Sequence, residues 1–324
     1  MIRIRQDLTP MALMDKIGRM WELSAAKIRS IEATCPPGSP SPVFTVKGKY
    51  TAKGWTEWTQ GFQYGASALQ FDATDDSDFL ALAKDRTREL MASHVTHTGV
   101  HDHGFNNVST YGNLRRLMLE GRFPHDDAEL AFYELALKAS GAVQARRWTP
   151  VADGDGYIYS FNGPHSLFAD TIRSLRSLSV GHMLGHALMG EHDERISLLE
   201  RMLVHARTTA RYTVYYGEGR DAYDIPGRVV HESIFNTNDG NYRCPSTQQG
   251  YSPFTTWTRG LAWVALGYPE ELEFLATRSD DELEPFGGRA EIESFMLRAA
   301  RAVCDFYIDH TPTVSYTHLR AHET

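Results

Sequence analysis

Cysteine is scarce in this sequence and shows no pairing pattern. The 324 residues include only Cys35, Cys244 and Cys304, which lie far apart along the chain. A small disulfide-stapled domain needs an even set of closely spaced cysteines, and this chain has neither feature. We therefore expect reduced thiols and a reducing compartment.

Long apolar runs and concentrated positive charge are missing as well. Residues 1–7 lack the apolar core of a secretion signal, and no run is long and apolar enough to span a bilayer. The formal net charge is −8 and the basic residues are scattered, whereas phosphate binding needs a concentrated basic face. These absences predict a soluble, cytoplasmic protein with no membrane or nucleic-acid partner, although a few local Arg or His residues suffice to bind a small anionic sugar.

The sequence also lacks a convincing interdomain linker. Its richest stretch of Pro, Gly and Ser, residues 35–42, is short and is interpreted as a surface loop. A chain of 324 residues is ample for a large core. We predict a single domain over residues 1–313.

The end of the chain differs in character from the rest. Residues 314–324 are similar to one reading frame of a sequencing adapter. We expect the biological sequence to end near Thr313 and exclude the tail from fold reasoning, as is done for fusion scars. In that case the tail packs against nothing; an ordinary polar tail is the alternative interpretation.

What the sequence does have is helical periodicity along most of its length. Thr9 and Pro10 form a helix start signal, and apolar residues then recur at helical spacing as far as Ile31. Strand-like alternation is limited to residues 157–161 and 228–235. Similar helical patterns cover residues 62–72, 77–95, 111–119, 126–142, 169–189, 191–213, 258–266, 270–276 and 289–308.

Two segments resemble each other in a way that indicates repeated helical hairpins. G-F-Q-Y-G at 61–65 and G-H-M-L-G at 181–185 each lead into a helical pattern, a polar turn and a second helix that Ser or Asp caps. Stacked hairpins are typical of a toroid or a solenoid. The small residues on the first helix of each pair suit close packing in an inner ring.

Three motifs carry residues that suit sugar chemistry. H-D-H-G-F at 101–105 and S-L-F-A-D at 166–170 each place one aspartate in an apolar setting, and a block from Gln248 to Trp263 supplies amide and aromatic groups. One carboxyl can move a proton, a second can steady positive charge, and flat rings pack against a pyranose face. The motifs therefore predict a carbohydrate-active site.

With these motifs the chain resembles glycoside hydrolase family 88, the unsaturated glucuronyl hydrolases. The resemblance implies an all-α fold, an (α/α)6 toroid of helical hairpins, here lacking the last helices that close the ring. It also implies an oligosaccharide substrate with a 4,5-unsaturated uronic acid at its non-reducing end. We expect no cofactor and no metal. The matching segments, in family order, are W-T-Q-G-F at 58–62, H-D-H-G-F at 101–105, A-D at 169–170, H-A-R-T-T at 205–209 and Q-G-Y at 249–251 continuing to Trp263.

The resemblance also implies roles for residues of this chain. Asp170 falls on the acid/base aspartate, and Asp102 falls on the second essential aspartate. Trp58 is a candidate for stacking on a sugar face. The family's site histidine, glutamine, arginine and tryptophan fall on His231, Gln249, Arg259 and Trp263.

An unsaturated uronide is a vinyl ether, and its cleavage begins at the double bond. Protonation of C4 places positive charge on C5 and the ring oxygen, water adds at C5, and the resulting hemiketal opens to release the neighbouring sugar. One group that donates a proton and then deprotonates water is sufficient, so the usual rule for the separation of two carboxylates does not apply directly. We expect Asp170 to have this role, with its pKa raised by burial or by Asp102.

The sequence departs from the family pattern at several positions. Gln63 stands where Trp is frequent after the Gly-Phe pair, and Leu261 stands where the Arg-Gly-Gln-Ala-Trp block has Gln. Arg173 and Arg176 follow Asp170, where the family is usually apolar or amide-bearing. These changes bear on the exact substrate more than on the reaction.

Two other functions are left open by the residues. A non-catalytic carbohydrate-binding α-toroid is one, although the intact pair of aspartates argues against it. The other is a metal-dependent hydrolase. Its candidate ligands are His97, His101 and His103 with Asp102, and His182 with His186 at i,i+4 spacing. Asp102 and Asp170 also have a purely structural interpretation, as a helix cap or as a buried salt-bridge partner.

Overall fold

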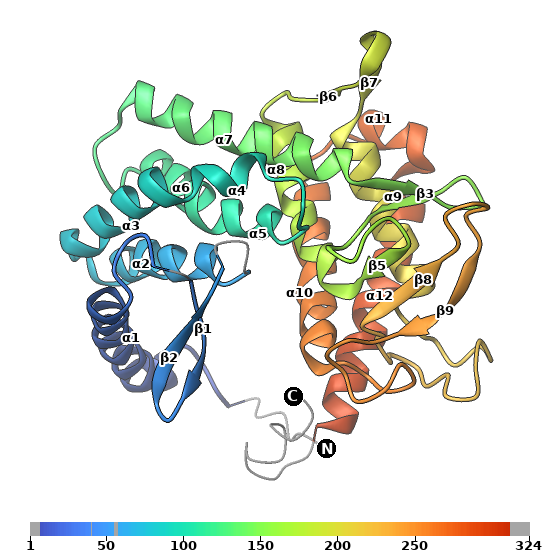
Figure 1. Ribbon diagram of the computed structural model, residues 1–324, viewed down its shortest axis with the longest axis horizontal. Coiled ribbons are helices and arrows are strands. Elements are labelled where there is room, and N and C mark those ends of the chain that lie inside the picture. Colours follow the sequence, from blue (N-terminus) through green and yellow to red (C-terminus); the bar gives the residue numbers. More distant parts are fainter. Residues whose placement is uncertain (1–6, 40, 55–57, 312–324) are drawn as a thin grey trace. The chain divides into compact units, whose positions relative to one another are not determined.

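The computed structural model describes residues 7–39, 41–54 and 58–311. Contacts within the chain divide it into two compact units, which are described separately: residues 4–140, the N-terminal unit, and the residues from Gly141 onwards, the C-terminal unit. Helices dominate in both units (Figure 1), and the predicted all-α class is confirmed. The single domain over 1–313 stays a prediction, and the tail at 314–324 lies outside the described residues.

The N-terminal unit consists of helices and one hairpin. The hairpin joins β1 (Ser41–Val46) to the antiparallel β2 (Lys49–Lys53). The helices are η1 (Met11–Leu13), α1 (Met14–Thr34), α2 (Gln60–Thr74), α3 (Ser77–Leu90), α4 (Ala92–Thr96), α5 (His103–Asn107), η2 (Val108–Gly112), α6 (Asn113–Leu119) and α7 (Asp127–Arg146), the last of which continues past Ser140. Every helix predicted between residues 14 and 142 is present, and the one over 77–95 is divided at Met91.

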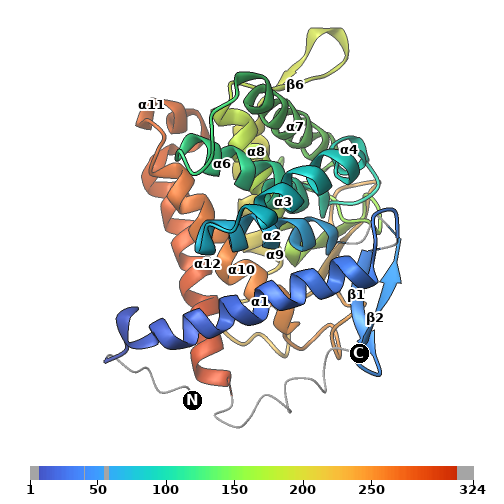
Figure 2. The same ribbon diagram turned by 90° about the vertical axis from the view of Figure 1, so that its left-hand side faces the viewer.

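α1 has the apolar stripe that its sequence predicts, but the described residues leave most of the stripe uncovered. Only Ile28 of this helix is buried, whereas Met14, Met20 and Leu23 are about half exposed. Figure 2 shows α1 running along the outside of the N-terminal unit beside the β1–β2 hairpin. An apolar helix face of this kind is a surface for association.

The predicted first hairpin is formed by α2 and α3. α2 ends at Asp75, whose left-handed backbone (φ 55°) stops the helix, and the carboxylate of Asp76 caps α3 by accepting the N–H of Asp78 at 3.0 Å. Gly61 lets α2 approach α5 closely, because a Cβ at this position would lie 2.3 Å from the Cα of Asn106. The small residue thus permits the close helix packing that the sequence predicts.

The C-terminal unit combines helices with small antiparallel sheets. Its strands are β3 (Trp148–Pro150), β4 (Gly156–Ile158), β5 (Ser166–Phe168), β6 (Leu188–Met189), β7 (Arg195–Ile196), β8 (Glu232–Phe235) and β9 (Tyr242–Ser246). Its helices are η3 (Ala169–Ser174), α8 (Leu175–Met183), η4 (Glu191–Asp193), α9 (Leu198–Tyr212), α10 (Thr258–Leu275), α11 (Asp280–Leu283), η5 (Glu284–Phe286) and α12 (Gly288–His310). One sheet has the order β5-β8-β9, while β3 pairs with β4 and β6 with β7. The strands predicted at 157–161 and 228–235 are present in shortened form as β4 and β8.

The predicted second hairpin is only partly correct. The helix predicted over 169–189 ends at Met183, because Gly185 adopts a left-handed φ of 73°. β6 and β7 then form a short hairpin in the interval. The helix predicted over 191–213 begins only after Ser197. Ser197 is the N-cap, and its hydroxyl accepts the backbone N–H of Glu200. The turn predicted between two helices is therefore a β-hairpin.

α10 is one continuous helix where the sequence predicts two. The helices predicted at 258–266 and 270–276 are separated by Pro269, which lies inside α10. A proline removes one backbone donor and favours a break or a kink. Packing holds the helix here, because the neighbouring Tyr268 is fully buried and its hydroxyl donates to the carbonyl of Ala206 at 2.8 Å. The tertiary contacts override the local signal.

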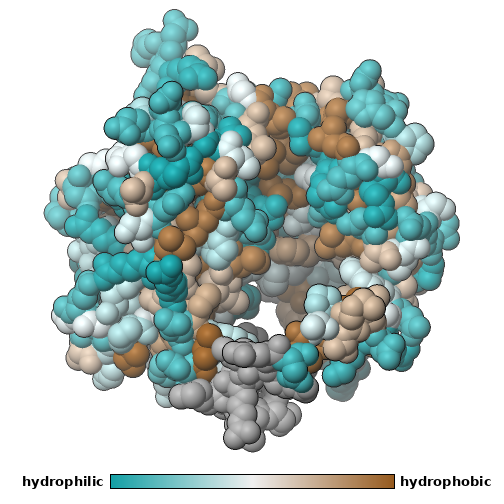
Figure 3. Space-filling view, turned by 180° about the vertical axis from the view of Figure 1, so that it is seen from behind, coloured by the Kyte–Doolittle hydropathy of each residue, from teal (hydrophilic) through white to brown (hydrophobic). Residues whose placement is uncertain are grey.

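The core of the C-terminal unit lies among α9, α10 and α12, with η3 and α8 packed against them. The apolar stripe predicted on the last helix is present, since Met296, Ala299 and Val303 are fully buried. The surface carries hydrophilic side chains interspersed with apolar ones (Figure 3). Among the helices of the described part of the chain, none has the length and hydropathy that a membrane span requires.

Candidate functional site

The residues predicted to form the site are divided between the two units. Trp58 and Asp102 belong to the N-terminal unit. The C-terminal unit contains Asp170, His231, Gln249, Arg259 and Trp263. Each group is described within its own unit.

His231 is the centre of the C-terminal group. Its side chain is buried between two aromatic rings, with centroids 4.4 Å from that of Phe168 and 4.2 Å from that of Trp257. Its Nδ1 accepts the backbone N–H of Gln248 at 3.0 Å and that of Gln249 at 3.4 Å. A backbone N–H can only donate, so Nδ1 carries no proton and the proton of the neutral ring is on Nε2. His231 is therefore a hydrogen-bond donor through Nε2.

Gln249 links His231 to the first turn of α10. Nη2 of Arg259 donates to Oε1 of Gln249. The guanidinium of Arg259 also lies 4.7 Å from the ring centroid of Trp257, which restricts its orientation. The structure thus brings together three of the predicted residues from three separate segments. Their imidazole, amide and guanidinium groups suit the recognition of a carboxylate.

Asp170 is attached to this cluster through the β5-β8-β9 sheet. Phe168 of β5 lies opposite Glu232 of β8, and the next N–H along the chain, that of Ala169, donates to the carbonyl of His231 at 3.0 Å. Asp170 follows in the first turn of η3 and is partly exposed, whereas the five other residues of η3 are buried. The carboxyl group therefore lies at the boundary between an apolar interior and solvent, which suits a group that must exchange protons.

Trp263 lies one turn after Arg259 on α10 and contacts η3. The guanidinium of Arg173 is 5.3 Å from the ring centroid of Trp263. Nε of Arg173 pairs with Oε2 of Glu270 at 2.7 Å, and Nη1 of Arg176 pairs with Oε1 of the same carboxylate at 2.9 Å. The two arginines that depart from the family pattern thus form ion pairs with Glu270, which join η3 and α8 to α10.

Asp102 occupies the N-cap position of α5 and is 8% exposed. Its carboxylate makes no capping hydrogen bond to the described backbone of this helix, so helix capping does not explain the residue. Oδ2 lies 3.8 Å from Nδ1 of His101, whose ring is fully buried. The pair forms an ion pair only when the imidazole is protonated.

Trp58 precedes α2 and packs edge-on against Phe62, with ring centroids 5.9 Å apart. Phe62 in turn stacks on Phe105 of α5 at 5.6 Å. Since Phe105 lies within the H-D-H-G-F motif, these contacts join that motif to W-T-Q-G-F. The structure thereby places Trp58 and Asp102 on neighbouring elements of the N-terminal unit.

His103, the residue after Asp102, belongs to a hydrogen-bonded chain of histidines. Nδ1 of His94 lies 2.9 Å from Nδ1 of His103, Nε2 of His103 lies 2.9 Å from Nδ1 of His97, and Nε2 of His94 bonds to Oε1 of Gln60. Because the amide oxygen of Gln60 only accepts, His94 donates through Nε2. A neutral His94 then accepts from His103 through Nδ1, and His103 accepts from His97 through Nε2. Burial, and to a lesser extent the charge of His97, lowers the pKa of His94 to about 4.

His97 and His103 do not have the arrangement that their spacing suggests for a metal site, whereas His101 and Asp102 lie close together, so a site built on this pair stays a prediction. His103 uses different nitrogens for its two neighbours, so the three imidazoles form a chain and do not converge on one point. The prediction that His182 and His186 share one helix face is wrong, because α8 ends at Met183. His182 instead bonds through Nε2 to Oε1 of Glu282 at 2.8 Å.

Several residues of these clusters have no role in the sequence prediction, although Phe168, Trp257 and Gln60 lie within its motifs and only His94 lies outside them. Phe168 and Trp257 bracket His231 from distant segments, and His94 and Gln60 reach His103 only through the fold. An isolated buried aromatic or histidine is most often a core residue, so only the three-dimensional contacts identify them.

No family model and no curated protein match this sequence, but solved structures do. One is an unsaturated glucuronyl hydrolase specific for heparin, with a TM-score of 0.69 and 19% identity over 92% of this chain and 69% of that chain. A second is the unsaturated glucuronyl hydrolase of Bacillus sp. GL1, with a TM-score of 0.61 and 19% identity over 88% of this chain and 67% of that one. A third is a mutant of the Streptococcus agalactiae enzyme complexed with dGlcA-GalNAc6S, with a TM-score of 0.55 and 15% identity over 92% and 67% of the two chains.

These similarities establish the fold. The chain has the helical toroid fold of the unsaturated glucuronyl hydrolases, which confirms the predicted fold class. Identities of 15–19% show a shared fold and do not show a shared reaction. The activity is therefore inferred from the site residues of this chain. The predicted lack of the ring-closing helices stays a prediction.

Proposed function

We propose that this protein is a glycoside hydrolase that releases a 4,5-unsaturated uronic acid from the non-reducing end of oligosaccharides. The observation that carries the proposal is the contact of His231, Gln249 and Arg259, with the partly exposed Asp170 joined to His231 through the backbone. Such a cluster combines anion recognition with a neighbouring proton donor. The fold supports the same substrate class, because one enzyme of this fold is complexed with dGlcA-GalNAc6S.

In the proposed reaction Asp170 supplies one proton and takes one back. The protonated carboxyl transfers its proton to C4 of the unsaturated ring, and positive charge spreads over C5 and the ring oxygen. The carboxylate then removes a proton from the water that adds at C5, which regenerates the acid. The hemiketal opens and the bond between C1 and the neighbouring sugar breaks, so that one water molecule is consumed in total.

Recognition of the uronate is assigned to the cluster around His231. The guanidinium of Arg259 pairs with the substrate carboxylate through charge-assisted hydrogen bonds. The bond from Arg259 to Gln249 and the packing on Trp257 hold the guanidinium in place before substrate arrives. Nε2–H of His231 supplies a further donor.

Three more residues complete the proposal. Asp102 steadies the positive charge and accepts a hydrogen bond from a sugar hydroxyl, in keeping with a buried carboxylate that does not cap its helix. Trp58 and Trp263 stack on sugar faces. These roles rest on the family resemblance and on the local surroundings of each side chain.

Loss of ultraviolet absorbance tests the proposal. The C4–C5 double bond is conjugated with the carboxylate, so hydration removes the absorbance of an unsaturated disaccharide. We expect consumption of at least one lyase product from chondroitin, hyaluronan, heparin, alginate, gellan or ulvan. Cleavage of saturated glucuronides with no effect on any unsaturated fragment would contradict the reaction. Binding without turnover would instead favour a non-catalytic carbohydrate-binding protein.

A further inference from the structure

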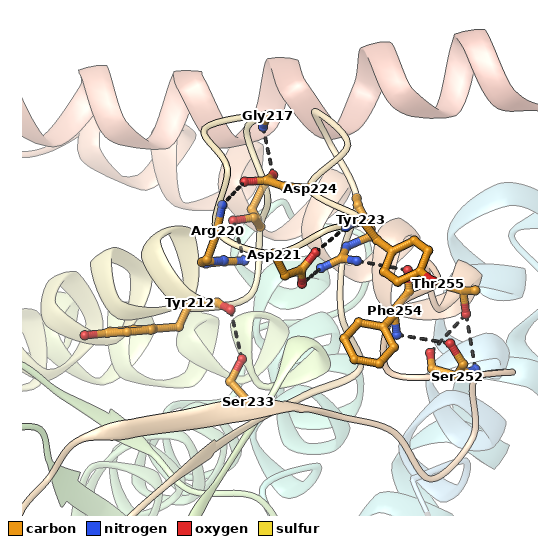
Figure 4. Close-up of polar contacts among 12 residues, drawn as sticks. Tyr212, Gly217, Arg220, Asp221, Tyr223, Asp224, Ser233, Ser252, Phe254 and Thr255 are labelled. Atoms are coloured by element: carbon orange, nitrogen blue, oxygen red, sulfur yellow. Dashed lines mark hydrogen bonds and ion pairs between the residues drawn. The ribbon is translucent and has the colours of Figure 1, made fainter.

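Two loops of the C-terminal unit present a pair of exposed aromatic rings. The rings of Tyr223 and Phe254 have centroids 5.3 Å apart, and the two residues are 55% and 43% exposed (Figure 4). A single exposed aromatic residue is ordinary, but two rings in contact form a continuous apolar surface. We call this pair the 223/254 platform.

A single buried arginine fixes the backbone on both sides of the platform. Arg228 is 1% exposed, and its Nη1 donates to the carbonyl of Phe254 at 2.9 Å. Its Nη2 donates to Oδ2 of Asp221 at 2.6 Å, and Oδ1 of Asp221 accepts the N–H of Tyr223 at 2.7 Å. Both aromatic residues are therefore anchored through their main chains, and Figure 4 shows their rings side by side.

Further polar contacts close the loop that carries Tyr223. The guanidinium groups of Arg220 and Arg228 lie 3.4 and 3.5 Å from the ring centroid of Tyr215. The carboxylate of Asp224 accepts the N–H of Gly217 at 2.8 Å and that of Arg220 at 2.7 Å. The loop is thus closed by polar groups other than the Tyr223 side chain.

The loop that carries Phe254 is ordered in the same way. The N–H of Phe254 donates to Oγ of Ser252 at 3.1 Å, and the N–H of Ser252 donates to Oγ1 of Thr255 at 3.2 Å. The main chains that carry both rings are therefore held by hydrogen bonds to other groups. A ligand that packs on the rings orders little of the backbone.

The platform is continuous along the chain with the cluster around His231. Phe254 lies three residues before Trp257, whose ring packs on His231. Three extended residues span at most about 11 Å. Flat aromatic faces match the C–H face of a pyranose, and the Tyr223 hydroxyl at the edge is suited to sugar hydroxyls.

We propose that the 223/254 platform is a subsite for a further sugar ring of the oligosaccharide, on its leaving-group side. The inference rests on the proposed function, in which the unsaturated residue is the non-reducing end of the substrate. All other sugar rings of the oligosaccharide then belong to the leaving group. An additional subsite can therefore bind only a sugar of the leaving group. The platform therefore favours substrates longer than a disaccharide.

The test compares two substrate lengths. We would measure kcat/KM by absorbance loss for an unsaturated disaccharide and tetrasaccharide of the same polymer. The variants are Tyr223→Ala, Phe254→Ala and, as a matched control, Tyr307→Ala, since Tyr307 is 52% exposed on α12 of the same unit. We expect the tetrasaccharide-to-disaccharide ratio to fall about fivefold in the platform variants and to be constant in the control. Phe254→Tyr keeps a ring and should keep the wild-type ratio.

The outcomes distinguish failure of the proposed subsite from failure of the proposed reaction. An unchanged ratio in both platform variants overturns the subsite. If the wild type turns over neither substrate, the proposed reaction fails, and titration calorimetry with the tetrasaccharide decides on the subsite. Weaker binding by Tyr223→Ala and Phe254→Ala then supports it, whereas equal binding or none overturns it. Should alanine impair folding, Tyr223→Leu and Phe254→Leu remove only the flat rings and give the same comparison.

Discussion

His94 lies inside the N-terminal unit with hydrogen bonds to His103 and Gln60, and its pKa is lowered to about 4, first by burial and then by the charge of His97. In the unfolded chain a histidine titrates near pH 6.5. Between these values the unfolded state binds the proton that the folded state does not. The free energy of unfolding should therefore fall by up to about 3 kcal/mol as the pH drops from about 6.5 to 4.

Chemical denaturation across this pH range checks the His94 prediction. His94→Gln should flatten the dependence of the unfolding free energy on pH, although it lowers the plateau by removing hydrogen bonds. His125, which is exposed and pairs with the exposed Asp127, supplies the control His125→Gln. Identical slopes in wild type and His94→Gln would show that this imidazole does not titrate as stated.

Glu271 on α10 has the opposite dependence. Its side chain is fully buried, and burial raises its pKa to about 7 despite the hydrogen bond from Oγ of Ser179 at 2.7 Å. An unfolded glutamate titrates near pH 4.3, so the folded state binds the extra proton between these values. The contribution to stability is present below about pH 4.3 and is lost as the pH rises through 7.

Glu271→Gln should remove this loss. We expect the variant to be stabilised relative to wild type at pH 8 by more than at pH 5, as thermal unfolding at both values would show. Glu273→Gln is the matched control, because Glu273 is exposed on the same helix. A gain that is equal at the two pH values would mean that Glu271 is not protonated in the folded protein near neutrality.

Among the structural elements, the loops at 217–228 and 251–255 are joined by one side chain, that of Arg228. Arg228→Gln should leave the carboxylate of Asp221 without its buried partner and remove a donor from the carbonyl of Phe254. We expect a loss of about 2–4 kcal/mol and faster amide hydrogen exchange in both loops. Arg243→Gln, at an exposed position of β9, should change neither quantity. Unchanged exchange in Arg228→Gln would remove the support proposed for the 223/254 platform.

The helices were predictable where an apolar stripe or a cap is local to the element. The stripe at Met296, Ala299 and Val303 marks α12, and the polar turn before Asp76 marks the start of α3. The helix bounds predicted from the sequence are wrong where contacts between distant residues determine them. Pro269 indicates a break that the packing of Tyr268 prevents, and the end of α8 depends on a left-handed backbone that the helical period does not show.

At the scale of the whole molecule, the candidate site was predictable as a set of residue types and not as an arrangement. Residue chemistry and the family resemblance both point to Asp170 and to the block that contains Gln249, whereas only the resemblance points to His231. The fold connects them, because β5 pairs with β8 beside Asp170 and because backbone groups of a later loop donate to Nδ1 of His231. The histidine chain from His97 to Gln60 was missed, since it depends on three segments that no sequence period connects.

The exposed face of α1 leads to a prediction about association. Met14, Met20 and Leu23 are about half exposed, so two molecules gain by covering these faces. We expect concentration-dependent self-association in sedimentation velocity, reduced by Met20→Gln combined with Leu23→Gln. A protein that stays monomeric at all concentrations, with the α1 face accessible to oxidation at its methionines, would contradict this expectation.

Asp170 is proposed to protonate the double bond of an unsaturated uronide, and a paired assay on two substrates checks this role. An unsaturated disaccharide and its saturated counterpart are incubated with wild type, Asp170→Asn and Asp309→Asn, the last of which changes an exposed acid on α12. We expect that only the unsaturated sugar is cleaved, that Asp170→Asn lowers kcat by about a hundredfold to ten-thousandfold, and that Asp309→Asn retains the wild-type rate. Full activity in Asp170→Asn, or cleavage of the saturated sugar alone, would contradict it.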